Sequence, residues 1–95
     1  MSEELQLIQA LSMDLLRAAI GYNRKSFKMA ETFSKEAKKR IIQLEDQNSK
    51  TYVKKILAQT KKHLKSNNPD HLLMYSVLLR NYAIGKTHLT GGFVD

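Results

Sequence analysis

The stretch NPDHLLMYSVLLRNYAIG at residues 68–85 decides the fold class, because it carries a clear helix start and is apolar almost throughout. Asn68 can cap the helix and Pro69 suits the first helical position, where no backbone N–H is needed. Asp70 then places a negative charge at the positive end of the helix dipole. Beyond this start, apolar residues fall on nearly every side, which is typical of a helix with several neighbours.

The rest of the sequence predicts more helices of ordinary length. Glycine and proline are rare, and long windows of Leu, Lys, Glu, Gln and Ala favour helix. We expect helices at about 3–20, 24–45, 50–65 and 69–84. The predicted fold is therefore all-α, a small bundle of about four helices. It forms a single domain over residues 1–84, closed by Gly85 and followed by a flexible tail over residues 85–95.

Two of the connections between the predicted helices lack a clear sequence signal. Gly21–Asn23 resembles a helix stop, yet the apolar stripes on either side are nearly in phase. A continuous helix over 3–45 would be about 65 Å long and would require an intertwined dimer. Ordinary helix lengths favour a break, and the sequence alone leaves both alternatives open. At Asp46–Ser49 the stripes are out of phase, which predicts a turn and an antiparallel helix pair with Ser49 as a cap.

Composition limits the classes of function. The 95 residues include no cysteine, which excludes disulfides, thiolate metal sites and a cysteine nucleophile. Asp14 and Arg17 interrupt the most apolar run, so no membrane span is expected. The acidic start of the sequence does not resemble a signal peptide, and we expect a cytoplasmic protein.

The net charge of +7 is concentrated in the middle of the chain. Residues 17–65 carry fourteen bases and four acids, whereas residues 1–16 are acidic and residues 66–95 are neutral overall. Between Asp46 and Asp70 there are six lysines and no acid. We call these residues the lysine face: Lys50, Lys54, Lys55, Lys61, Lys62 and Lys65. On the helix before it, Glu31 and Glu36 are placed to pair with Lys35 and Arg40, but the lysine face has no acid at helical spacing. This face predicts an anionic partner.

Motifs for catalysis or metal binding are weak. Gly85-Lys86-Thr87 resembles the end of a phosphate-binding loop, but Arg80 stands where that motif needs glycine. No histidine has a second metal ligand at helical spacing. Asp14, amid apolar residues, is best explained by a polar contact to a neighbouring helix, possible partners being Arg17 and Tyr22. We therefore predict no catalytic, cofactor-binding or metal-ligating residues. An enzyme would need a pocket that gathers His71, Asp14 and a tyrosine.

Two hypotheses about function follow. The first and fourth helices carry more apolar surface than a chain of this size can bury, which predicts a non-enzymatic adaptor or regulatory protein that acts through protein contacts as a homodimer. The expected dimer or partner surface comprises Leu7, Leu11, Met13, Leu73, Val77 and Arg80. The alternative is non-specific nucleic-acid binding by the lysine face, because lysine contacts phosphate without reading bases. A membrane-bound helix is disfavoured, since core burial explains the apolar residues of the third helix.

Overall fold

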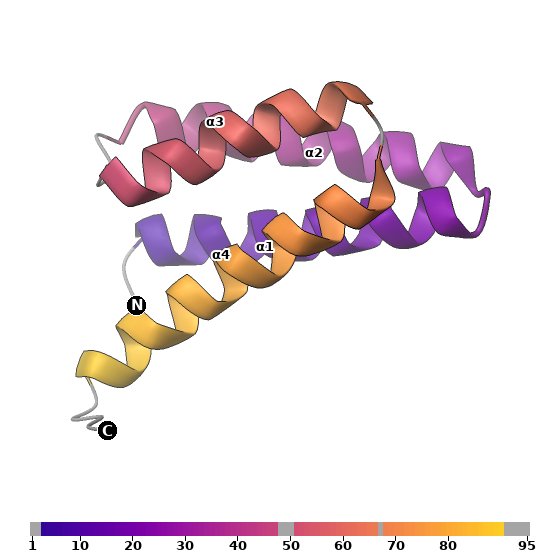
Figure 1. Ribbon diagram of the computed structural model, residues 1–95. Coiled ribbons are helices and arrows are strands. Elements are labelled where there is room, and N and C mark those ends of the chain that lie inside the picture. The colour runs from indigo at the N-terminus through magenta and orange to yellow at the C-terminus, as the bar shows by residue number, and fades with distance from the viewer. Residues whose placement is uncertain (1–2, 48–50, 67, 91–95) are drawn as a thin grey trace.

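The computed structural model describes residues 3–47, 51–66 and 68–90, and all four elements within them are helices. They are α1 (Glu3–Asn23), α2 (Phe27–Glu45), α3 (Thr51–Ser66) and α4 (Pro69–Thr90). Successive helices run in opposite directions (Figure 1). α1 packs against α2 and α4, and α3 packs against the same two helices, which places α1 and α3 diagonally. The predicted all-α bundle of four helices is confirmed.

The chain breaks between α1 and α2, but Gly21 is not the stop that the sequence indicated. α1 continues to Asn23, and Lys25 adopts a positive φ of 59°. The N–H of Ser26 donates to the Gly21 carbonyl at 2.8 Å, and the N–H of Lys25 donates to the Tyr22 carbonyl at 3.2 Å. These two bonds form a Schellman motif with lysine at the left-handed position that glycine usually occupies.

Gly21 has a different role, which is to let α2 approach α1. A Cβ atom at this position would lie 2.7 Å from the backbone nitrogen of Ala30 and 2.9 Å from its Cα. Those distances are shorter than real Cβ contacts. Because the bundle is only 42 Å in its longest dimension, a continuous helix over residues 3–45 would not fit within it.

The start of α4 confirms the predicted cap, while its end corrects the prediction. The side-chain oxygen of Asn68 accepts hydrogen bonds from the N–H groups of Asp70 at 2.9 Å and His71 at 3.3 Å. At the other end, α4 passes through Gly85 and continues to Thr90. Nothing lies within 4 Å of the place where a Cβ would stand on Gly85, and glycine weakens a helix interior without having to end it. The predicted end of the helix at residue 84 is therefore wrong, because α4 takes in residues 85–90 of the predicted tail. Residues 91–95, and the predicted cap Ser49, lie outside the described residues.

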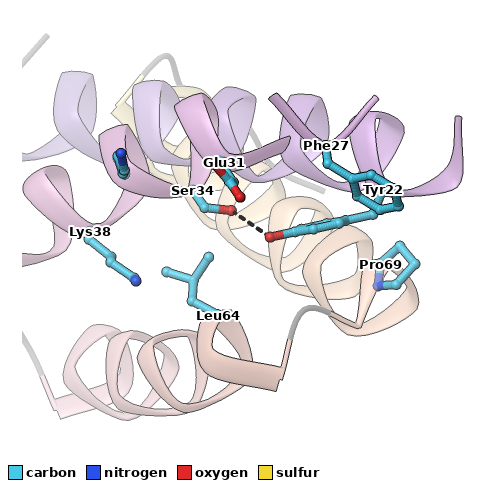
Figure 2. A pocket seen from close by; sticks show the side chains of 8 residues that line it. Tyr22, Phe27, Glu31, Ser34, Lys38, Leu64 and Pro69 are labelled. Atoms are coloured by element: carbon cyan, nitrogen blue, oxygen red, sulfur yellow. Dashed lines mark hydrogen bonds between the residues drawn. The ribbon is translucent and has the colours of Figure 1, made fainter. Parts of the chain in front are cut away.

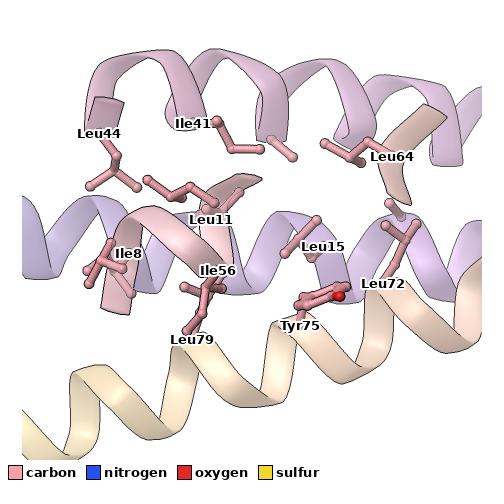
Figure 3. Close-up of a cluster of buried hydrophobic side chains, with 14 of the residues drawn as sticks. Ile8, Leu11, Leu15, Ile41, Leu44, Ile56, Leu64, Leu72, Tyr75 and Leu79 are labelled. Carbon is pink, nitrogen blue, oxygen red and sulfur yellow. The ribbon is translucent and has the colours of Figure 1, made fainter. Parts of the chain in front are cut away.

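All four helices contribute side chains to one hydrophobic core (Figure 3). The largest side chains with almost no exposure are Ile8, Leu11, Leu15, Ile41, Leu44, Val53, Leu57, Leu72 and Leu79. Burial of each such side chain stabilises the fold by about 1.5–3 kcal/mol.

Two buried serines join α1 and α4 by reciprocal hydrogen bonds. The Ser12 hydroxyl donates to the Ser76 carbonyl, and the Ser76 hydroxyl donates to the Ser12 carbonyl, both at 2.9 Å. Serine is small enough to let the two helix backbones approach closely. The pair therefore fixes where α4 lies along α1.

Candidate functional site

The described part of the lysine face is exposed as predicted. Lys54, Lys55, Lys61, Lys62 and Lys65 are all solvent-exposed on α3, and Lys50 lies outside the described residues. The expectation that no acid neutralises this face is wrong at one position. The Lys61 ammonium group lies 3.6 Å from the Glu45 carboxylate of α2. This ion pair joins two helices, so the spacing of residues within one helix could not reveal it.

The structure also adds α2 residues to the edge of the lysine face. A hollow of about 210 Å³ between α2 and α3 is lined by Lys38 and Ile42 together with Ile41, Lys61 and Lys65. Ile42 is 55 % exposed. Three lysine side chains therefore line one apolar hollow, and their positive charges attract anions to this surface.

The outer side of α4 is largely apolar. Five large side chains between residues 73 and 84 keep 36–45 % of their surface exposed: Leu73, Met74, Val77, Leu78 and Ile84. We call these five residues the α4 face. Met13 of α1 is 43 % exposed and lines a hollow of about 260 Å³ with Arg80 and Ile84, so it extends the apolar surface onto α1.

The predicted partner surface is corrected in its α1 part. Leu11 is 0 % exposed and lies in the core, and Leu7 is half-buried against that core. Neither residue lies in an exposed apolar patch. An apolar pattern that surrounds the helix does not show which side meets α2 and α4, and Leu11 points inward between them. Of the predicted surface residues, Met13, Leu73, Val77 and Arg80 are exposed.

Asp14 contacts a neighbouring helix, but neither Arg17 nor Tyr22 is its partner. The Arg40 Nε donates to the Asp14 carboxylate at 2.6 Å, and the Asp14 side chain is only 6 % exposed. Glu36, which spacing paired with Arg40, instead lies 3.3 Å from Lys39. Arg40 therefore supplies the counter-charge that a buried carboxylate needs.

Two histidines meet where α3 ends and α4 begins. The ring centroids of His63 and His71 are 4.2 Å apart, and the Tyr75 ring lies 5.4 Å from His63. Partial burial lowers the pKa of His63 below its usual 6.5, and the positive charges of His71 and Lys62 lower it further. Nδ1 of His71 is buried, and no described residue forms a hydrogen bond with it.

Asp14 and His71 contact different residues. The Asp14 carboxylate accepts a hydrogen bond from Arg40 of α2, whereas the His71 ring contacts the His63 ring of α3 at an angle of 54°. Within residues 3–47, 51–66 and 68–90, no group of three or more His, Cys, Asp or Glu side chains could hold a metal ion.

A hollow of about 480 Å³ lies where the end of α1 meets α2, α3 and the start of α4 (Figure 2). Its lining includes Phe27, Lys38 and Leu64 beside the Tyr22 hydroxyl, which lies 3.5 Å from the Ser34 hydroxyl. Its volume would suit a small molecule. Its other titratable lining residues are Glu31, Lys35 and Lys38.

The described helices include none long and apolar enough to cross a lipid bilayer. No protein-family model matches the chain, and comparisons with curated proteins and with solved structures give no significant match.

Proposed function

We propose that this chain is a non-enzymatic helical protein that acts as an adaptor or regulator through protein contacts, as a homodimer. The observation that carries the proposal is the α4 face. Single exposed apolar residues are normal on a protein surface, whereas several gathered on one face commonly mark a protein interface. The α4 face gathers five large apolar side chains, each more than a third exposed.

Sedimentation equilibrium tests this proposal, with Val77→Gln as the variant and Ile42→Gln as the matched control. Both positions hold β-branched side chains exposed by 44 % and 55 %, but Ile42 lies on α2, away from the α4 face. We expect the wild type to dimerise, Val77→Gln to raise the dissociation constant about tenfold, and the control to leave it unchanged. A wild type that stays a 10.9 kDa monomer up to about 0.5 mM would contradict the homodimer.

A second candidate function, non-specific binding of nucleic acid, is favoured by the lysine face. Four of its described lysines have no ion pair within the described residues, and Lys38 of α2 adds a fifth ammonium group at its edge. Lysines of this kind neutralise phosphates and release counterions, so the affinity should fall steeply with salt.

Fluorescence anisotropy with labelled duplex and single-stranded DNA tests this second function. The variant is Lys54→Glu/Lys65→Glu, and the control is Arg24→Glu/Lys28→Glu, which makes the same charge change at exposed positions elsewhere. Binding that depends on salt and is lost only in the first variant would support it. Equal loss in both variants would show that net charge alone is responsible, and no binding by the wild type would exclude the function.

A further inference from the structure

The outer side of α4 carries the repeat of a coiled-coil seam. Residues 70, 73, 77, 80 and 84 follow the alternating three- and four-residue spacing of a heptad, and at 100° per residue they lie within an arc of about 80°. They are Asp70, Leu73, Val77, Arg80 and Ile84, and all five are exposed. The inner side of the same helix is already occupied by α1 and α3. The seam is therefore additional to the packing of the bundle.

The two charged residues of this seam are Asp70 and Arg80. Among the described residues, neither the Asp70 carboxylate nor the Arg80 guanidinium makes an ion pair. They are ten residues apart on one helix, about 15 Å along its axis, so they cannot reach each other. An acid and a base that flank Leu73 and Val77 are complementary to a surface with the opposite order of charges.

A second copy of α4 that runs antiparallel provides that order. When Asp70 faces Arg80 of the other copy, Arg80 also faces Asp70, because a twofold interface repeats each contact. The same alignment, centred on residue 75, places Leu73 opposite Val77 and Val77 opposite Leu73. A parallel pair would place each charge opposite itself, and a shift by one heptad step would place Arg80 against Val77.

We propose that the homodimer forms through an antiparallel α4–α4 seam in which two Asp70–Arg80 ion pairs flank Leu73 and Val77. This inference rests on the homodimer proposed above and specifies its surface, orientation and register. Met74 and Leu78 flank the seam on one side, and Met13 of α1 lies beside Arg80 and Ile84 on the other. The apolar residues supply the affinity, and the charges select the register.

Charge reversal tests the register directly. Asp70→Lys leaves two bases on each seam, and Arg80→Glu leaves two acids, so each variant repels itself. Mixed in equal amounts, however, the two variants regain both ion pairs in a heterodimer. We expect each variant alone to raise the dissociation constant about tenfold or more, and the mixture to associate nearly as well as the wild type.

Sedimentation equilibrium at about 0.15 M salt measures these constants, and far-UV circular dichroism checks that each variant folds. Lys28→Glu, an exposed change on α2, controls for net charge and should leave the constant unchanged. If the wild type dimerises but neither reversal weakens it, or if both weaken it and mixing restores nothing, the antiparallel seam is refuted while the homodimer stands. A wild type that remains monomeric refutes both proposals.

Discussion

Replacing Gly21 by alanine should destabilise the bundle, although alanine is the better helix former. The new Cβ would lie 2.7 Å from the Ala30 nitrogen, about 0.7 Å short of the 3.4 Å at which ordinary contact begins. The nearest atoms belong to the α2 backbone, which cannot rotate away as a side chain can. The helices must therefore separate at this crossing, and their packing must loosen.

The size of this effect follows from two opposing terms. Forcing an extra carbon into a tight interface lowers the free energy of unfolding by about 1–3 kcal/mol. Exchanging glycine for alanine inside a helix raises it by about 1 kcal/mol. Because the nearest atoms belong to the backbone, the packing cost should lie in the upper half of its range, about 2–3 kcal/mol. We therefore expect Gly21→Ala to lower the free energy of unfolding by about 1–2 kcal/mol. In a domain of this size, such a loss lowers Tm by roughly 5–15 °C.

Gly85→Ala is the matched control, because it makes the same chemical change in open space. It should raise the free energy of unfolding by about 0.5–1 kcal/mol, since α4 continues past this position. Urea denaturation followed by circular dichroism compares both variants with the wild type. If Gly21→Ala is as stable as the wild type, the contact with the α2 backbone does not limit the size of residue 21. If Gly85→Ala is less stable than the wild type, alanine does not favour the helix at position 85 as we expect.

Three further predictions concern local features of the fold. Lys25→Gly removes a lysine from the left-handed region and should stabilise the protein by about 1 kcal/mol in urea denaturation; a loss would contradict the assigned turn. Arg40→Met leaves the Asp14 carboxylate buried without its partner and should cost about 2–3 kcal/mol, whereas adding Asp14→Asn should recover part of that loss. Additive losses in this double-mutant cycle would show that the two residues are not coupled. Because the pKa of His63 is lowered in the folded protein, the unfolded chain binds the proton more readily, and stability should fall as the pH drops below about 6.5. His63→Gln should flatten this part of the profile of urea midpoint against pH, and an unchanged profile would assign the dependence to other groups.

Local sequence signals identified the helices well. The Asn68-Pro69-Asp70 start is encoded within three neighbouring residues, and the structure shows the expected hydrogen bonds. The end of α1 was harder to place, because Gly21 and Asn23 both accept the left-handed conformation more easily than Lys25, where it occurs. Glycine at position 85 was ambiguous for a related reason, since it can end a helix or lie within one.

Contacts between helices were less predictable. Spacing within one helix paired Arg40 with Glu36, but Arg40 contacts Asp14, 26 residues away. Likewise, the sequence of a helix that is apolar on all sides does not show which side faces the core. Leu11 and Leu73 were therefore both predicted to lie on the surface. Tertiary packing places Leu11 in the core and leaves Leu73 exposed.

The reciprocal bonds between Ser12 and Ser76 have a consequence for how the protein can diverge. The two hydrogen bonds fix the register of α4 along α1. Sliding α4 by one turn, about 5.4 Å, would break both of them together. The position of α4 is thus set entirely from its inner side. Substitutions on its outer side can accumulate without moving the helix, and binding preference can evolve there while the bundle itself stays the same.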